Sequence, residues 1–332
     1  MPHVDLETSE TFFYTIATPS QPSASQIIQA LPTLVLIHPA YTGSAIFHSI
    51  YANRHLRRFN LVSMDLRGHG WTSATVDDSY SSETVADDVL RLMDRLKIFN
   101  FHVAGISTGG SIALQLAIAV PERILSVFMM SAAPQHEPAE SMQGRHEIAR
   151  YWVQAHQPNA NAADKVAAED AIYGSLQLAY SNMETPLIRA IRDYSIEKAE
   201  HNWTRDNLHY IELLTIQFHL NQPIYTFEML RRIRCPMLLV HCSEDFVYPR
   251  IHAEELLNLL RTANVDVKLE TIEGAPHWGN VTHPDETNTL LYNFVTDHCN
   301  ASDLPLPPDV VESPFSEELA RHGFQDGDVE SD

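Results

Sequence analysis

The pentapeptide at 105–109, Gly-Ile-Ser-Thr-Gly, has the residue types and the spacing that can present a reactive serine. It follows an apolar run and precedes an apolar helical stretch, the strand–turn–helix context in which G-x-S-x-G exposes a hydroxyl. Glycines on both sides are needed for so tight a reversal, because a Cβ there would collide with the neighbouring strand and helix. The pattern predicts Ser107 as a nucleophile; a merely structural glycine-rich turn is the alternative.

A serine hydroxyl is a poor nucleophile until a base takes its proton, so a histidine has to reach Ser107. The chain holds 18 histidines, most of which must be surface or packing residues. His277 lies in a loop of small residues, GAPHWG, between a predicted strand and the last predicted helix. Its position predicts His277 as the base.

An acid that orients the histidine is expected directly after another strand. The segment SEDFVYP follows the predicted strand 237–241, and Asp245 begins its D-x-x-x-P turn. Asp245 is therefore the predicted acid, with Glu244 beside it and Glu137, after an earlier strand, as alternatives. The order serine, aspartate, histidine along the chain is distinct from the orders in the chymotrypsin and subtilisin folds.

Acyl transfer also needs hydrogen-bond donors for the developing oxyanion. The backbone N–H of Thr108, which follows the predicted nucleophile, is one candidate. The second is expected from the loop 38–41, where Pro39 has no N–H, so the N–H of Ala40 is the better assignment. A side-chain role for Tyr41 is a weaker alternative.

Strands and helices alternate along the first half of the chain and again near its end. Short apolar or β-branched runs predict strands at 11–17, 34–38, 61–65, 101–106, 124–130, 237–241 and 265–269. Helical spacing predicts helices at 83–98, with Ser82 as N-cap, and at 110–120, 251–261 and 284–295. This alternation predicts the α/β class, with a mostly parallel sheet and helices on both faces.

Between residues 134 and 232 only helical periodicity is found. The expected division is therefore a first core part at 1–133, a helical insertion at 134–232 and a second core part at 233–299. Residues 300–332 hold nine acidic side chains and a single basic one, Arg321. That charge predicts an acidic, disordered tail.

Composition excludes several kinds of partner. The formal net charge of −21 argues against nucleic acid and against anionic membrane surfaces, because both require clustered Lys and Arg. No apolar run is long enough to predict a membrane span. Three cysteines and an N-terminus without a signal pattern predict a reducing, cytoplasmic location. Nothing in the sequence speaks against a homodimer.

With these residues placed, the chain resembles the α/β-hydrolase superfamily over about residues 11–299. Four features carry the resemblance: LIHPAYTGS, DLRGHGWTS, GISTGG, and the pair SEDFVYP and GAPHWG. They are specific for the fold and much less so for a substrate. One departure is Pro39, which stands where glycine is usual after the loop histidine and stiffens the loop that carries the predicted oxyanion donor.

The resemblance implies an α/β-hydrolase fold and a serine hydrolase that cleaves an ester or lactone of a small molecule, with neither metal nor organic cofactor. Cleavage of a C–C bond, perhydrolysis, or a small-molecule receptor on this fold are the alternatives. Serine at 107 speaks against epoxide hydrolases, whose nucleophile is a carboxylate. In the resemblance DLRGHG is a structural loop, so Asp65, Arg67 and His69 stay outside the catalytic set.

The resemblance also implies that the helical insertion is a cap over the active site. Aromatic residues of this block and of the catalytic loops are then candidates for substrate contact. The chosen set is Tyr41, Trp152, Trp203 and Trp278; further aromatics of the block are Tyr151, Tyr194, Tyr210 and Phe218. The alternative is that aromatics at helical spacing only hold the helices together.

Overall fold

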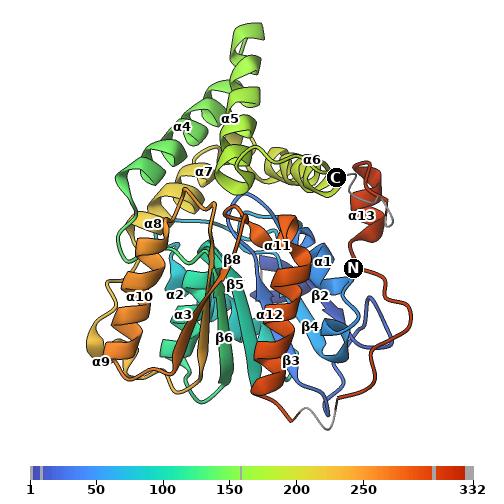
Figure 1. Cartoon of the computed structure of the whole chain (residues 1–332). Coiled ribbons are helices and arrows are strands. Elements are labelled where there is room, and N and C mark those ends of the chain that lie inside the picture. The colour runs from blue at the N-terminus through green and yellow to red at the C-terminus, as the bar shows by residue number, and fades with distance from the viewer. Residues whose placement is uncertain (1–2, 8–9, 158, 301–303, 326–332) are drawn as a thin grey trace.

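A sheet of eight strands forms the centre of the computed structural model (Figure 1), which describes residues 3–7, 10–157, 159–300 and 304–325. The strands are β1 (His3–Glu7), β2 (Glu10–Ala17), β3 (Thr33–Ile37), β4 (Asn60–Met64), β5 (Phe101–Ile106), β6 (Ile124–Met130), β7 (Met237–Cys242) and β8 (Val267–Ile272), in the order β1-β2-β4-β3-β5-β6-β7-β8. From β4 to β8 along that order all neighbouring strands are parallel. At the other edge, β1 is antiparallel to β2, and β2 is antiparallel to β4. The predicted mostly parallel sheet is therefore confirmed.

The central strands are buried on both faces because helices cover both. Along β3, Val35 and Ile37 enter one apolar cluster while Leu34 and Leu36 enter the other, as the alternation of strand side chains requires. Helices α2 (Ser82–Arg95), α3 (Thr108–Ala119) and α10 (Arg250–Thr262) pack in the first cluster. Helices α1 (His48–Tyr51) and α12 (Pro284–Asp297) pack in the second.

Most predicted elements appear with small shifts at their ends. The ranges 101–106 and 124–130 match β5 and β6, whereas β8 runs from Val267 to Ile272 rather than over 265–269. The predicted N-cap Ser82 is wrong by one residue. Ser81 caps α2, because its side chain accepts from Thr84 N while the Thr84 hydroxyl accepts from Ser81 N.

The segment between β6 and β7 is helical, and all but its last helix lies across the carboxyl ends of the parallel strands (Figure 1). It contains α4 (Ala139–Ala155), α5 (Ala162–Tyr180), α6 (Pro186–Asn202), η3 (Arg205–Asn207), α7 (Tyr210–Glu212), η4 (Leu213–Gln217), α8 (Phe218–Leu220) and α9 (Phe227–Leu230). Two side chains at the end of α6 attach it to the sheet loops: Asn202 Nδ2 donates to Gly70 O and Trp203 Nε1 to Gly68 O, both at 2.8 Å. The DLRGHG loop thus anchors the helical insertion.

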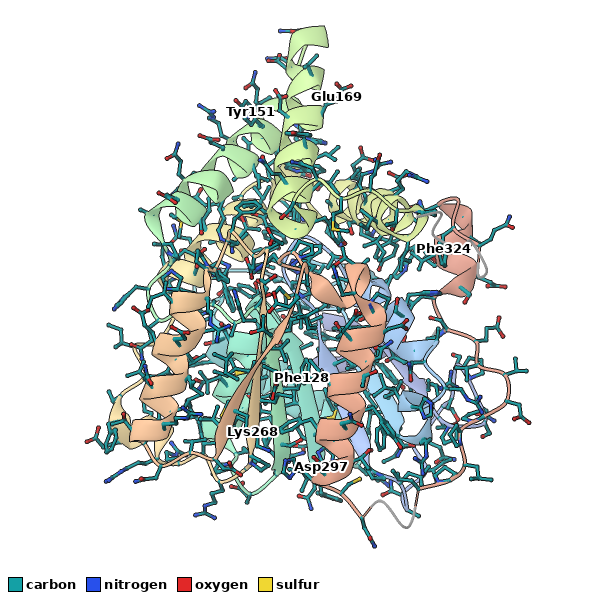
Figure 2. The ribbon with its side chains drawn as sticks, in the orientation of Figure 1. Phe128, Tyr151, Glu169, Lys268, Asp297 and Phe324 are labelled. Atoms are coloured by element: carbon teal, nitrogen blue, oxygen red, sulfur yellow. The ribbon has the colours of Figure 1, made fainter. Side chains whose placement is uncertain are left out.

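The predicted disordered tail is wrong for residues 304–325. There α13 (Ser316–Arg321) packs beside α6, and Phe315 and Leu319 are buried in the second apolar cluster. Phe324 follows on the same segment (Figure 2), its ring 5.1 Å from that of His48. The average charge of the segment gives no sign of these apolar residues, whose burial stabilises the packing of the segment against the core. Residues 301–303 and 326–332 lie outside the described part.

The remaining short helices lie beside the sheet ends. They are η1 (Ser44–Phe47), η2 (Leu56–Arg58) and α11 (Gly279–Thr282). From η2, Arg57 Nη1 donates to Glu312 O at 2.8 Å and Arg58 Nε to Pro305 O at 2.6 Å. These hydrogen bonds hold the backbone of the C-terminal segment against the core.

Candidate active site

Ser107 occupies the turn between β5 and α3 in a strained backbone conformation. Its φ of 51° and ψ of −117° lie outside the regions that non-glycine residues favour. A Cβ on Gly105 would overlap the backbone of Gly109, and a Cβ on Gly109 would overlap the carbonyl of Ile37 in β3. The two glycines therefore allow the chain to reverse where Ser107 stands, and that turn places the hydroxyl at the carboxyl end of β5.

Three residues from distant parts of the chain form one hydrogen-bonded row. His277 Nε2 lies 2.9 Å from Ser107 Oγ, and His277 Nδ1 lies 2.8 Å from Asp245 Oδ2. All three residues are buried. With the imidazole proton on Nδ1, facing the carboxylate, Nε2 is free to accept the proton of the Ser107 hydroxyl.

The carboxylate of Asp245 is held by its own turn as well as by His277. Its Oδ1 accepts hydrogen bonds from Val247 N at 3.0 Å and Tyr248 N at 2.9 Å. Burial alone would raise the pKa of Asp245, but the charge and hydrogen bond of His277 and the Tyr248 N–H hold that pKa below its ordinary value. Asp245 is therefore ionised, as a residue that orients a histidine must be.

The two alternative acids do not reach His277. Glu244 is exposed, and its backbone carbonyl accepts a hydrogen bond from Ser181. Glu137 pairs with Arg145, Nε to Oε1 at 2.8 Å, and accepts from the Tyr248 hydroxyl. Of the three carboxylates that the sequence leaves open, only Asp245 makes the contact.

The loop carrying the predicted oxyanion donor Ala40 is fixed by His38. His38 Nδ1 donates to Pro39 O at 2.7 Å, and His38 Nε2 accepts from Leu66 N at 2.9 Å. Tyr41, next in the loop, has a φ of 68°. Ala40 and Thr108 both line the cavity that Ser107 lines, so the proline at position 39 does not keep the loop away from the serine.

A small cavity contains the serine, and a larger, mainly apolar cavity adjoins it. The first is lined by Ser107, His277, Ala40, Thr108, Arg145 and Val247, among others. The second lies among α4, α5 and α6 and is lined by Trp152, Trp203 and Ile191, among others. Four residues line both: Tyr41, Ser175, Ala179 and Trp278.

The four predicted contact residues, Tyr41, Trp152, Trp203 and Trp278, thus all lie on these two cavities. Tyr151 does not: it lies on α4, away from the sheet (Figure 2), and lines a separate groove between α4 and α5. Sequence reasoning missed Arg145, Ser175 and Ala179, because a polar or small residue on a helix gives no sign of which cavity it lines. In sequence, Arg145 looks like any solvated arginine.

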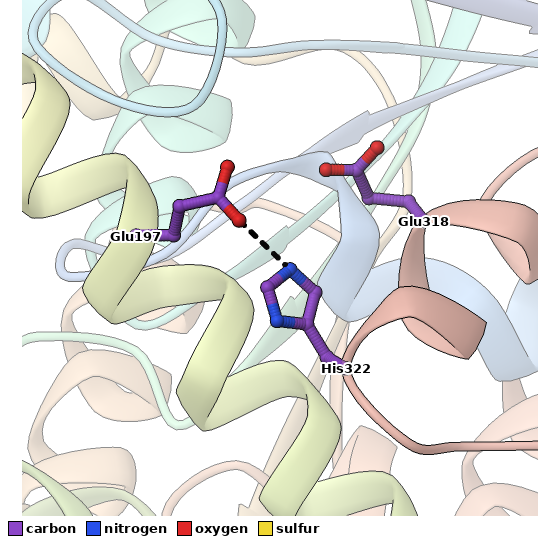
Figure 3. A group of neighbouring side chains, drawn as sticks. All are labelled: Glu197, Glu318 and His322. Atoms are coloured by element: carbon purple, nitrogen blue, oxygen red, sulfur yellow. Dashed lines mark ion pairs between the residues drawn. The ribbon is translucent and has the colours of Figure 1, made fainter.

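Among the described residues one group of three could hold a metal ion: Glu197, Glu318 and His322 (Figure 3). It lies between α6 and α13, and His322 Nε2 is 3.2 Å from Glu197 Oε2. Lys198 Nζ lies 2.5 Å from Glu197 Oε1 and 3.3 Å from Glu318 Oε1. Because the ammonium already supplies the positive charge, we assign the group as an ion-pair cluster that holds α13 against α6.

Two buried histidines beside the site make stability depend on pH. Burial lowers the pKa of His38 to about 4, and burial together with His38 lowers the pKa of His69 to about 3. The folded protein therefore keeps both neutral, while the unfolded chain takes up protons below pH 6.5, so stability is lost as the pH falls from 6.5 toward those values.

We expect the free energy of unfolding to fall by about 2 kcal/mol for His69 alone between pH 7.5 and pH 5. In His69→Gln the amide can still donate to Arg67 O, which His69 Nδ1 contacts at 2.8 Å, but it does not titrate. Urea unfolding at both pH values should therefore show a smaller acid loss in His69→Gln. His146→Gln, at an exposed position of α4, is the control and should keep the full loss. Equal acid losses in wild type and His69→Gln would contradict the prediction.

The sheet order and the helices on both faces are those of the alpha/beta hydrolase fold. The alpha/beta hydrolase fold family matches residues 32–284, and the chain belongs to that family. A putative carbamate hydrolase RutD of Caulobacter sp. (strain K31) is 24% identical over 275 residues, covering 79% of this chain and 90% of that protein.

Solved structures show the same fold. The enol-lactonase of Burkholderia xenovorans LB400 has a TM-score of 0.65 at 18% identity, covering 89% of this chain and all of that one. A carboxylesterase structure from Nitrososphaera gargenis has a TM-score of 0.67 at 20% identity, covering 91% and 100%. Within the described residues, no helix combines the length and the apolar character needed to cross a membrane.

Proposed function

We propose that this protein is a serine hydrolase that cleaves a carboxylic ester or lactone of a small organic molecule. The observation that carries the proposal is the continuous row of hydrogen bonds from Asp245 through His277 to Ser107. The row ends at a cavity that Ala40, Thr108 and Trp278 also line. Such a row is what a serine needs to become a nucleophile.

In the proposed reaction Ser107 Oγ attacks the carbonyl carbon while its proton passes to His277 Nε2. The N–H groups of Ala40 and Thr108 are proposed to stabilise the oxyanion, and Asp245 stabilises the imidazolium. The C–O bond to the leaving alcohol then breaks, and the alcohol oxygen takes the proton from Nε2. Water attacks the acyl-enzyme in the same way, releasing the acid and returning the proton to Ser107.

The cavities favour a substrate with an apolar part. The larger cavity is lined mainly by aromatic and aliphatic side chains, and it shares Tyr41, Ala179 and Trp278 with the serine cavity. An apolar acyl or alcohol group can be buried there while the scissile carbonyl lies at Ser107.

Cleavage of a carbamate is the second candidate, because the sequence relative named above is a putative carbamate hydrolase. The chemistry uses the same serine and histidine, and the leaving group is then an amine or ammonia. C–C bond hydrolysis and perhydrolysis need the same row as well, so only the products separate these reactions. A receptor would bind ligand without turnover.

A fluorophosphonate probe followed by a substrate panel tests the proposal. We expect the probe to label the peptide that contains Ser107, and His277→Ala to abolish labelling. We expect p-nitrophenyl esters or small lactones to be hydrolysed faster than a matched carbamate. Absence of both labelling and turnover would reject the proposal, and preference for the carbamate would select the second candidate.

A further inference from the structure

A buried arginine lines the cavity that contains Ser107, and the proposed hydrolysis does not use it. Arg145, on α4, has only 4% of its surface exposed. Burying a guanidinium is costly unless its charge and its N–H groups find partners. Its surroundings therefore indicate what it is for.

Two groups hold Arg145 in place. Its Nε donates to Glu137 Oε1 at 2.8 Å, and its Nη2 donates to the Tyr248 hydroxyl at 3.0 Å. That hydroxyl in turn donates to Glu137 Oε2 at 2.8 Å, and His219 Nδ1 lies 3.4 Å from the same oxygen. Glu137 and Arg145 each make the other's charged form more stable, which raises the pKa of Arg145 despite its burial.

The guanidinium also neighbours Tyr41. The Tyr41 hydroxyl is buried close to the guanidinium: the side chains of Arg145 and Thr215 both act on its pKa, which burial raises, yet it makes no well-formed hydrogen bond with a described residue. Arg145 and Tyr41 both line the serine cavity. A fixed guanidinium and a buried hydroxyl therefore border the space in which a substrate would react.

The charge balance indicates what these donors bind. Glu137 already neutralises Arg145, and burial together with Arg145 lowers the pKa of His219, so His219 adds no positive charge. A second carboxylate in this cavity would have to be buried without a counter-charge of its own, which is costly. A neutral acceptor, such as a carbonyl or hydroxyl oxygen, gains the hydrogen bond without that cost.

We propose that Arg145 and Tyr41 form a subsite for a neutral acceptor oxygen of the substrate. The inference rests on the proposed function and narrows it: the substrate is an ester or lactone that carries a second, uncharged oxygen group close to the scissile carbonyl. Arg145 is then a residue that selects the substrate, while Ser107, His277 and Asp245 carry the reaction.

Matched substrate pairs test the subsite. On the acyl side, p-nitrophenyl 3-oxobutanoate is compared with p-nitrophenyl butanoate; on the alcohol side, 2-oxopropyl acetate is compared with butyl acetate. We expect wild type to prefer the oxygen-bearing member of at least one pair by roughly 10-fold or more in kcat/KM. Each ratio is corrected for the rates of the uncatalysed reactions.

The decisive variant is Arg145→Met combined with Glu137→Gln, because removal of the arginine alone would leave the Glu137 charge buried and unpaired. We expect its preference to fall to about 1, because kcat/KM falls more for the oxygen-bearing member than for the plain ester. Arg150→Met, an exposed arginine on the same helix, is the control and should keep the preference. An unchanged preference in the double variant, no preference in wild type, or equal losses on both members of a pair would overturn the proposal.

Binding separates failure of the subsite from failure of the proposed function. In Ser107→Ala protein, quenching of the tryptophans that line the cavities, Trp278 among them, gives the dissociation constant of each ester. If the wild-type protein hydrolysed none of these esters, the proposed hydrolase function would be rejected. The ratio of the dissociation constants within each pair would still test whether the subsite binds the second oxygen. Tighter binding of a p-nitrophenyl hydrogen succinate than of both neutral acyl esters would contradict the neutral acceptor.

Discussion

Replacement of Ser107 by alanine should reduce turnover roughly 10⁴- to 10⁶-fold while the protein remains folded. The serine hydroxyl makes its hydrogen bond to His277 Nε2, and no other group at that position can attack a carbonyl. The side chain is small and buried, so its removal leaves little empty volume. The remaining activity would come from the backbone N–H groups and from binding of the substrate.

The measurement is kcat on the best ester of the panel, with circular dichroism and the Tm as checks on folding. Ser111→Ala is the matched control, because Ser111 is also buried and lies one turn further along α3. It should keep activity within roughly 3-fold. Ser107→Ala with near-normal turnover, or labelled by the fluorophosphonate at another residue, would show that the nucleophile lies elsewhere.

The second large effect is expected on stability. Gly109→Ala should lower the free energy of unfolding by about 4 kcal/mol or more, since the new Cβ would overlap the backbone carbonyl of Ile37 in β3. A backbone carbonyl cannot move away by rotation as the end of a flexible side chain can, so α3 and β3 would have to separate. That movement would also displace Thr108 and Ser107, and activity should fall with stability.

Gly110→Ala supplies the contrast within the same helical turn. The nearest atom that its Cβ would meet is Gly105 O at 3.6 Å, an ordinary contact. Alanine is the better helix former by about 1 kcal/mol, so Gly110→Ala should leave stability equal or slightly higher. Urea unfolding of both variants decides the matter: equal stability of Gly109→Ala and wild type would mean that β3 and α3 approach less closely than described.

The tail and the insertion show where sequence patterns stop being informative. Average charge predicted disorder at 300–332, but Phe315 and Leu319 bury against the core and Lys198 meets the charge of Glu318. No local signal marks this outcome, because Lys198 and the Tyr51 ring that packs against Phe315 both lie more than a hundred residues away in sequence. The same holds for the DLRGHG loop, whose carbonyls anchor Asn202 and Trp203.

By itself the sequence determined the α/β class, most strands and the candidates Ser107, Asp245 and His277, because strand and helix periodicities and the GISTG turn are local properties of the chain. Only the tertiary structure decided among Asp245, Glu244 and Glu137, since carboxylates near the sheet differ only in which one reaches His277. It alone also revealed Arg145 in the serine cavity. Which cavity a side chain lines, and which charged group it pairs with, depend on the distant segments that fold against it. The periodicity of the sequence does not contain that information.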